Sequence, residues 1–251
     1  MAESAKDLFS AHSDIYVKYR PLYPKELYDF ILEHVPVKET ALDCGTGNGQ
    51  AAAVLAEHFR IVHATDISER QIMNAIQKPN LHYHVCSAEQ TPFPDNSFDL
   101  VTSATAVHWF HFDNFFREIK RVGKKNSLFA CWGYKVFRTD QPRLDELIDT
   151  FYCKTIHPYW DAERRHVDEE YQNIPFPFEE IKNPGFATRL TWGLEMLQGY
   201  LDTWSAVQHY IQKNKFNPVN ELMDQIRSEF GEELKLQITF PVFMRMGIIK
   251  R

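Results

Sequence analysis

Three glycines follow a short apolar run near residue 41 and precede a run of good helix formers. The segment reads Ala41-Leu42-Asp43-Cys44-Gly45-Thr46-Gly47-Asn48-Gly49-Gln50. Glycine allows a tight turn with positive φ and leaves bare backbone for a ligand at the amino end of a helix. Asp66 ends a second apolar run, where a carboxylate can accept hydrogen bonds from both hydroxyls of a ribose. These residue types predict a site for a cofactor that contains a nucleoside.

The glycine pattern is G-x-G-x-G, because Gln50 stands where the dinucleotide fingerprint has its third glycine. This departure argues against NAD or FAD. With Asp43 ahead of it, the pattern resembles motif I of the class I S-adenosylmethionine-dependent methyltransferases. Two later segments strengthen the resemblance, Ser87-Ala88-Glu89 and Phe98-Asp99-Leu100-Val101. Other nucleotide-binding α/β proteins and an inactive relative stay open.

The elements around these residues are predicted to alternate between strand and helix. Strands are expected at 40–45, 61–66, 81–86, 98–104 and 127–134, and helices at 49–59, 68–77 and 112–122. Such alternation predicts a parallel sheet with right-handed crossovers. Further helices are expected at 143–153, 197–213 and 218–230, and strand-like segments at 188–196 and 234–249. The resemblance implies an α/β, Rossmann-like, seven-stranded sheet that is mostly parallel, with one antiparallel strand in a closing hairpin.

A chain of 251 residues with 44% hydrophobic residues predicts a single domain over 1–251. Its expected parts are an amino-terminal lid at 1–30, a cofactor-binding core at 40–137, a substrate-cap insertion at 138–186, and carboxyl-terminal helices with the closing hairpin at 187–251. The insertion is helical and aromatic, and we expect it to lie over the active site.

Charge and hydropathy argue against several classes of partner. The net charge of −6 gives no broad attraction to phosphate backbones, so no nucleic-acid substrate is expected. No apolar run is long enough to span a bilayer and no signal-peptide core is present, so a cytoplasmic protein without membrane association is expected. No obligate protein partner is evident. The cysteines lack C-x-x-C spacing and the histidine pairs lack acidic or cysteine partners, so neither disulfides nor a metal site is expected.

The resemblance implies S-adenosyl-L-methionine as the cofactor. It implies that Asp43 orients the glycine turn or, through water, the ammonium group of the cofactor, and that Asp66 holds the ribose. Ala88 backbone or the Glu89 side chain is expected at the adenine, with a solvated loop acid as the alternative for Glu89. Arg20 is expected to pair the cofactor's carboxylate from the lid, unless this segment only covers a sheet face. The expected cofactor-binding residues are Tyr19, Arg20, Asp43, Gly45, Thr46, Gly47, Asp66, Ile67, Ser87, Ala88, Glu89, Thr105 and Ala106.

The segment Ala104-Thr105-Ala106-Val107-His108-Trp109-Phe110 follows the fourth predicted strand. Ligands of open α/β sheets bind beyond the carboxyl ends of the strands, so this segment is expected between cofactor and acceptor. His108 is the candidate catalytic base. The alternative is that His108 only hydrogen-bonds a neighbouring loop or packs beneath Trp109.

Further segments narrow the resemblance: Y-x-x-Y-R-P-x-Y-P, H-W-F, Y-W-D-x-x-R-R-x-V-D-E-x-Y and I-P-F-P-F-E-E. Together they resemble a group of small-molecule methyltransferases that includes the yeast trans-aconitate and cantharidin enzymes. This implies a small, acidic acceptor and favours O-methylation of a carboxylic acid. N- or C-methylation of a small molecule, tRNA or protein and a non-catalytic cofactor-binding protein are the alternatives.

The insertion carries the residues expected to face an acidic acceptor. Trp160 is expected to supply a hydrophobic wall, and Arg164 with Arg165 a cationic clamp, unless nearby acids pair with both arginines. The expected substrate-binding residues are Tyr16, Trp109, Tyr134, Trp160 and Arg164.

Overall fold

The computed structural model describes residues 19–250. One open sheet runs through this part of the chain in the order β3-β2-β1-β4-β5-β9-β6, with β7 and β8 also paired to β9. The parallel strands are β1 (Thr40–Cys44), β2 (Ile61–Asp66), β3 (Leu81–Val85), β4 (Phe98–Ala104) and β5 (Gly123–Tyr134). The others are β6 (Arg138–Thr139), β7 (Glu179–Ile181), β8 (Phe186–Gly193) and β9 (Lys235–Ile248).

Nine strands occupy seven positions across the sheet. On one side, β9 pairs with β5 through residues 242–248 and with β6 through 238–239. On its other side, β9 pairs with β7 through 246–248 and with β8 through 235–242. All four pairings are antiparallel, so β9 alone runs against the other strands. The Rossmann-like sheet with one antiparallel strand is therefore confirmed. The two additional strands, β6 and β7, are short extensions paired to β9.

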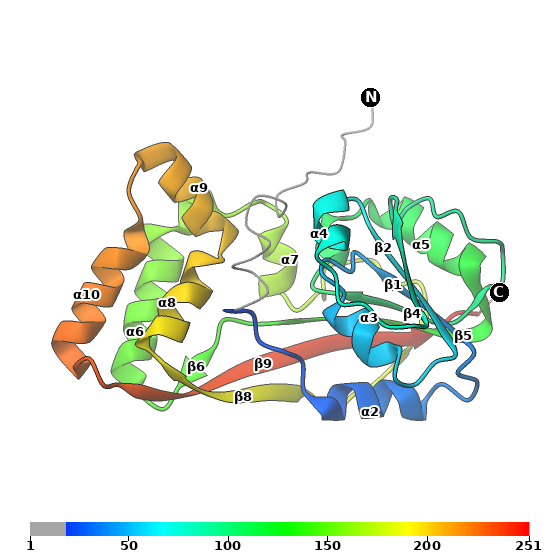
Figure 1. Ribbon diagram of the computed structural model, residues 1–251, viewed down its shortest axis with the longest axis horizontal. Helices are drawn as coiled ribbons and strands as arrows, with labels where there is room; N and C mark the ends of the chain where they lie inside the picture. Colours follow the sequence, from blue (N-terminus) through cyan, green and yellow to red (C-terminus); the bar gives the residue numbers. More distant parts are fainter. Residues whose placement is uncertain (1–18, 251) are drawn as a thin grey trace.

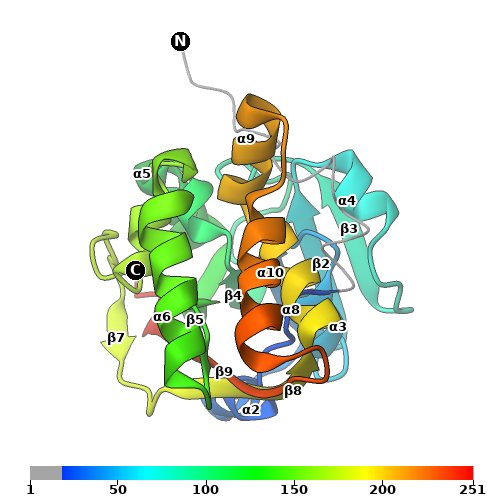
Figure 2. The same cartoon turned by 90° about the vertical axis from the view of Figure 1, so that its left-hand side faces the viewer.

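Helices form two groups around the sheet (Figure 1). The parallel half carries α2 (Lys25–Glu33), α3 (Gln50–Leu55), α4 (Glu69–Met73), the 3₁₀ turn η2 (Val107–Trp109) and α5 (Phe112–Val122). The other half carries α6 (Pro142–Thr150), η3 (Phe151–Thr155), η4 (His157–Tyr159), α7 (Arg164–Asp168), α8 (Leu194–Asp202), α9 (Ser205–Asn214) and α10 (Pro218–Phe230). Figure 2 shows α6, α10 and α8 side by side at one end of the molecule.

The central strands are buried on both faces, which explains their continuous apolar runs. Leu42, Val101 and Phe129 are adjacent across β1, β4 and β5 and are all fully buried. Two hydrophobic clusters cover the faces, one containing residues of α2 and α3 and the other containing residues of α5. The parallel register brings the carboxyl ends of β1, β2, β3 and β4 to one edge, where ligands of such sheets bind.

Several predicted boundaries match, and others are wrong. The strand at 98–104 and the helices at 112–122 and 218–230 are confirmed to the residue. The helix predicted at 197–213 is two helices, because the chain is extended at Trp204, which is buried against Tyr200. The helices predicted at 49–59 and 68–77 end early, at Leu55 and Met73.

Two expectations from composition can be compared with the structure directly. Cys44, Cys86, Cys131 and Cys153 are all free thiols. Within residues 19–250, no helix combines the length and the apolar character that crossing a bilayer requires.

Candidate active site

The glycine turn between β1 and α3 lies at the carboxyl edge of the sheet. Gly45 and Gly47 have positive φ values of 66° and 55°. A Cβ at Gly45 would lie 2.5 Å from the Cβ of Ala106, so this turn packs directly on the segment after β4. At Gly47, by contrast, a Cβ would meet no atom within 4 Å. Gly47 therefore presents bare backbone to open space, as ligand binding at a helix amino end requires.

A cavity opens at this edge between the glycine turn and the segments after β2, β3 and β4. The predicted cofactor residues that line it are Gly45, Thr46, Gly47, Asp66, Ile67, Ala88, Glu89, Thr105 and Ala106. Tyr19, Arg20, Asp43 and Ser87 are not among its lining residues. Sequence reasoning did not assign Tyr23, Asn48, Gln71 or Cys86, which also line it. Asn48 and Tyr23 stand within the glycine and Y-x-x-Y-R-P-x-Y-P motifs, which could have pointed to them, whereas Gln71 of α4 and Cys86 reach the cavity only through the tertiary fold.

Asp66 is held in place by backbone donors. Its Oδ2 accepts a hydrogen bond of 2.8 Å from Gly47 N–H, and its Oδ1 accepts one of 2.9 Å from Ser68 N–H. Ser68 is the N-cap of α4, and its Oγ accepts from Gln71 N–H at 3.3 Å. Each carboxylate oxygen can accept more than one hydrogen bond, so this arrangement also suits contact with two hydroxyls.

Asp43 lies beneath the glycine turn and is fully buried. Thr46 Oγ1 donates to its Oδ2 at 2.6 Å, and Thr102 Oγ1 donates to its Oδ1 at 2.7 Å. Burial raises the pKa of Asp43 to about 6, although the two hydroxyl donors oppose the shift and nearby Asp66 adds to it. The carboxylate therefore ties the turn to β4, which is the first of its two expected roles.

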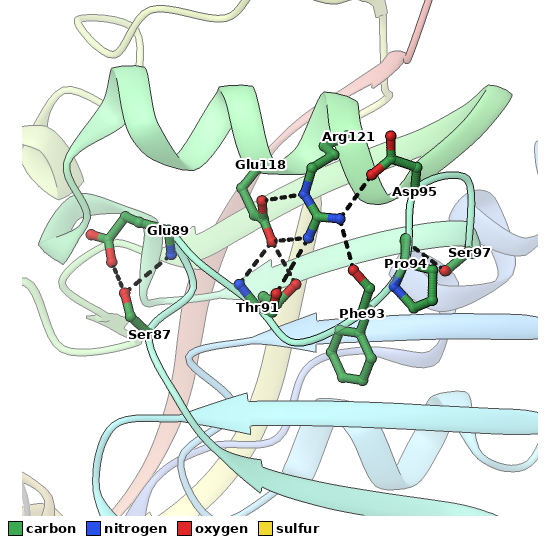
Figure 3. Close-up of polar contacts among 9 residues, drawn as sticks. All are labelled: Ser87, Glu89, Thr91, Phe93, Pro94, Asp95, Ser97, Glu118 and Arg121. Carbon is green, nitrogen blue, oxygen red and sulfur yellow. Dashed lines mark hydrogen bonds and ion pairs between the residues drawn. The ribbon is translucent and has the colours of Figure 1, made fainter.

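Glu89 contacts Ser87 in the segment after β3 (Figure 3) and joins this segment to the start of α5. Its carboxylate accepts hydrogen bonds from the Ser87 hydroxyl and, at 2.9 Å, from His111 N–H. His111 is the N-cap residue of α5, where a negative charge is favourable. Glu89 thus holds the loop after β3 against the start of α5.

Arg121 of α5 contacts the rest of the loop between β3 and β4 and holds it in place (Figure 3). It donates to both oxygens of Glu118 at 2.8 and 2.6 Å, to the Phe93 carbonyl at 2.7 Å and to Asp95 at 2.9 Å. Glu118 in turn accepts from the N–H and hydroxyl of Thr91 at 2.7 and 2.6 Å. Burial would raise the pKa of Glu118, but hydrogen bonds from Arg121 and Thr91 outweigh it and lower the pKa overall.

Replacing Arg121 with alanine is expected to destabilise the protein by about 1–3 kcal/mol, because the buried Glu118 carboxylate loses its cationic partner. Urea unfolding measures this change. The matched control is Arg117→Ala on the same helix, since Arg117 makes one exposed hydrogen bond of 3.3 Å to Asn114. Equal unfolding free energies for the two variants would contradict the structural role of Arg121.

A second cavity adjoins the first. It is lined by Arg20, Thr105, His108, Trp109, Trp160, Asp161, Arg164, Trp204 and Ser205. Thr105 and Trp109 line both cavities and so form a shared wall. Thr105 has a φ of 52°, which is strained for a β-branched residue, and its Oγ1 lies 2.5 Å from Tyr23 Oη. Strained backbone of this kind is concentrated at functional sites.

His108 lies in the wall of the second cavity and is buried. Its Nδ1 is 3.0 Å from Tyr171 Oη, and its ring centroid is 4.9 Å from that of Trp109. Burial lowers the pKa of His108 to about 3, and the charges of Arg164 and His166 add to the shift. The imidazole is therefore neutral at physiological pH and weakly basic.

Only some of the residues expected to contact the acceptor line the second cavity. Trp109, Trp160 and Arg164 line the second cavity, whereas Arg165 does not. Arg164 Nε donates to Tyr152 Oη at 2.8 Å and to Asp168 Oδ1 at 3.1 Å, so one arginine of the expected clamp is paired with an acid.

The lid residues also differ from expectation. Arg20 lines the second cavity, and it donates to Tyr134 Oη at 2.6 Å and to the Thr203 carbonyl at 3.1 Å. Tyr134 thus contacts Arg20 and lines neither cavity. Tyr19 lies against Gly199 of α8. Tyr16 falls outside the described residues.

Comparisons with known proteins agree with this geometry. A family model described as "Methyltransferase domain" matches residues 42–131. A Dictyostelium discoideum protein named "Putative methyltransferase" is 31% identical over 95% of this chain and 93% of its own length. A malonyl-[acyl-carrier protein] O-methyltransferase of Marinomonas is 32% identical over 52% of this chain and 49% of its own length. The solved structure of a "Putative Type II Methyltransferase" from Anaeromyxobacter dehalogenans has a TM-score of 0.85 and 37% identity, covering 92% of this chain and 99% of that one.

Proposed function

The chain belongs to the class I S-adenosylmethionine-dependent methyltransferases, and we propose that it methylates a carboxylate oxygen of a small acid. S-adenosylmethionine is its cofactor. The first cavity suits this molecule, because Gly47 leaves open space for it and Asp66 offers a fixed carboxylate. When bound, the cofactor supplies a methyl group already activated on a sulfonium.

The proposed roles of the first-cavity residues follow from their places in its wall. Asp66 accepts hydrogen bonds from the ribose hydroxyls, and the backbone at Gly45 and Gly47 receives the amino-acid end. Ala88 and Glu89 flank the adenine from the loop after β3. Methyl transfer is an in-line displacement, so these residues act by aligning the reactants and excluding water.

The residues that line the second cavity are the basis of the proposal for the acceptor. It shares a wall with the first cavity, and two arginines, Arg20 and Arg164, line it. The pKa of about 3 leaves His108 poorly suited to remove a proton from an acceptor. A carboxylate needs no such base, because it is already ionised at neutral pH. Its oxygen bonds to the methyl carbon as the carbon–sulfur bond breaks, giving a methyl ester and S-adenosylhomocysteine.

Two further observations support an acidic acceptor that is methylated on oxygen. The Marinomonas relative is named as an O-methyltransferase, although the match covers only about half of each chain. The segments around Tyr19 and Trp160 resemble those of the trans-aconitate and cantharidin group, and we propose that this chain belongs to that group. We also propose that residues 19–30 form part of a lid and that 138–186 cap the acceptor, supported by the contact of Tyr23 with Thr105 and the position of Trp160 in the second cavity.

His108→Ala is expected to slow methylation by less than about tenfold and to leave the pH–rate profile unchanged. His108 has a pKa of about 3, so the imidazole is neutral throughout the range of about pH 5 to 9 and contributes no titration there. Steady-state kinetics across this range measure both effects. A loss of about a hundredfold or more, together with loss of a titration near pH 6–7, would favour a base and contradict the carboxylate acceptor.

A panel of small acids tests the proposed function. Each acid is incubated with the protein and methyl-labelled S-adenosylmethionine beside the corresponding amide, and products are identified by mass spectrometry. We expect label on acids and none on the amides, because the amides lack the anionic nucleophile. Transfer to amines or to carbon acceptors, with none to any acid, would overturn the proposal.

A further inference from the structure

Two consecutive residues that line the second cavity each carry a buried polar atom without a hydrogen-bond partner in the described part of the chain. Among residues 19–250, Asp161 Oδ2 and Trp160 Nε1 have no hydrogen-bond partner. Both residues line the cavity. Most buried polar side-chain atoms in proteins are paired, and each unpaired one costs about 1–3 kcal/mol. An acceptor and a donor left unpaired on consecutive residues in one cavity wall indicate a bound partner.

No neighbouring side chain in the described part of the chain donates a hydrogen bond to Asp161 Oδ2. His209 has its Nδ1 3.9 Å from Asp161 Oδ2, which exceeds hydrogen-bond distance. That nitrogen is 2.9 Å from the Tyr159 carbonyl, which can only accept, so its proton points toward Tyr159. Arg164 Nε donates to Tyr152 and Asp168.

Trp160 is held by packing against three neighbouring side chains. The Arg164 guanidinium lies 4.8 Å from the centroid of its indole ring, and the Trp204 and Tyr152 ring centroids lie at 5.7 and 5.1 Å. These contacts fix the ring and hence the direction of its N–H. The donor at Nε1 is thus preorganised.

We propose that the acceptor carries a hydroxyl or ammonium group near its carboxylate, and that Asp161 accepts a hydrogen bond from it while Trp160 donates to an oxygen of the same molecule. This inference rests on the proposed function, because it treats the second cavity as the acceptor site. Arg20 and Arg164 favour the carboxylate, and His108 adds no charge. An unsubstituted dicarboxylate lacks a hydrogen-bond donor for Asp161, so hydroxy- or amino-carboxylic acids are favoured.

Matched acids test this inference on the full-length protein saturated with cofactor. Succinate, malate and aspartate differ at one carbon by hydrogen, hydroxyl and ammonium; glutarate, 2-hydroxyglutarate and glutamate repeat the series one carbon longer. We expect kcat/KM for a substituted acid to exceed that of its parent acid by at least about tenfold, the effect of one hydrogen bond to a charged acceptor. Binding of the same acids in the presence of S-adenosylhomocysteine is measured by calorimetry.

Substitutions at Asp161 measure how much this side chain contributes to the preference for substituted acids. Asp161→Ala is expected to remove the preference for substituted acids and leave the parent acids within about twofold, mainly through KM. Asp161→Asn retains an acceptor oxygen without the charge, so it is expected to keep part of the preference for the hydroxyl and lose that for the ammonium. Glu169→Ala is the matched control, because Glu169 is an exposed carboxylate in the same insertion outside the cavity.

The outcomes are distinguishable. Methylation of parent and substituted acids at equal rates, insensitive to Asp161→Ala, would overturn this inference and leave the carboxylate acceptor standing. If no acid of either series is bound or methylated while S-adenosylhomocysteine still binds, the proposed function fails and the inference fails with it.

Discussion

Replacing Asp66 with alanine is expected to weaken binding of S-adenosylhomocysteine by about 30- to 1,000-fold, which corresponds to about 2–4 kcal/mol. In the proposed site the carboxylate accepts hydrogen bonds from both ribose hydroxyls, and each bond to a charged acceptor contributes about 1.5–3 kcal/mol before non-additivity. The variant also removes the acceptor for the N–H groups of Gly47 and Ser68. Isothermal calorimetry measures the change.

Two companion variants isolate the role of the Asp66 carboxylate. Asp66→Asn keeps the size and one acceptor oxygen, so its loss of affinity is expected to fall between those of the parent and Asp66→Ala. Glu69→Ala removes a nearby acid that is exposed in the first turn of α4 and lies outside the cavity. It is expected to bind as the parent does. Binding by Asp66→Ala as tight as that of the parent would contradict the proposed ribose contact.

Gly47→Val is expected to abolish detectable cofactor binding while the protein stays folded. The Cβ position at Gly47 faces open space in the cavity, so a branched side chain would occupy room that the ligand needs. Equilibrium dialysis with labelled cofactor measures binding, and circular dichroism checks the fold.

The control for Gly47→Val is Gly185→Val. Gly185 also has a positive φ, 78°, and no atom within 4 Å of its Cβ position, but it lies outside the first cavity. Valine imposes backbone strain at both sites, so only the effect on binding should differ. If Gly47→Val bound the cofactor as the parent does, the glycine turn would have to be assigned elsewhere.

The glycine turn and Asp66 were predictable from sequence because their chemistry is local. A turn that leaves backbone open to a ligand needs glycine, and the acid stands at the end of an apolar run. The bond from His111 N–H to Glu89 joins residues 22 apart, and the contact between Tyr23 and Thr105 joins residues 82 apart. Such contacts depend on how the loops pack, so motifs alone do not reveal them.

The contacts of Arg20 also could not be predicted from sequence, although it lies within the Y-x-x-Y-R-P-x-Y-P motif. The resemblance assigned it to the cofactor's carboxylate, but its guanidinium donates to the carbonyl of Thr203, 183 residues away. The place of Arg20 therefore depends on the turn between α8 and α9, which the sequence pattern presented as one continuous helix. Buried aromatic residues such as Trp204 fit a helix face and an extended turn equally well in a hydrophobicity pattern.

Fold elements were predictable where periodicity was strong. The strand β4, buried in all but its last residue, and the amphipathic α5 and α10 have their predicted bounds. The extensions β6 and β7, with two and three residues, are too short to show alternation and exist only because β9 is long enough to pair with them.

The chemical stability of the transferred label tests the carboxylate acceptor most directly. Acids from the panel are methylated with methyl-tritiated S-adenosylmethionine, and the purified product is treated with mild alkali. A methyl ester hydrolyses to the parent acid and volatile methanol, so we predict that the label becomes volatile in proportion to the acid recovered. Label that stays on the product after complete alkaline treatment would show transfer to nitrogen or carbon and contradict the account.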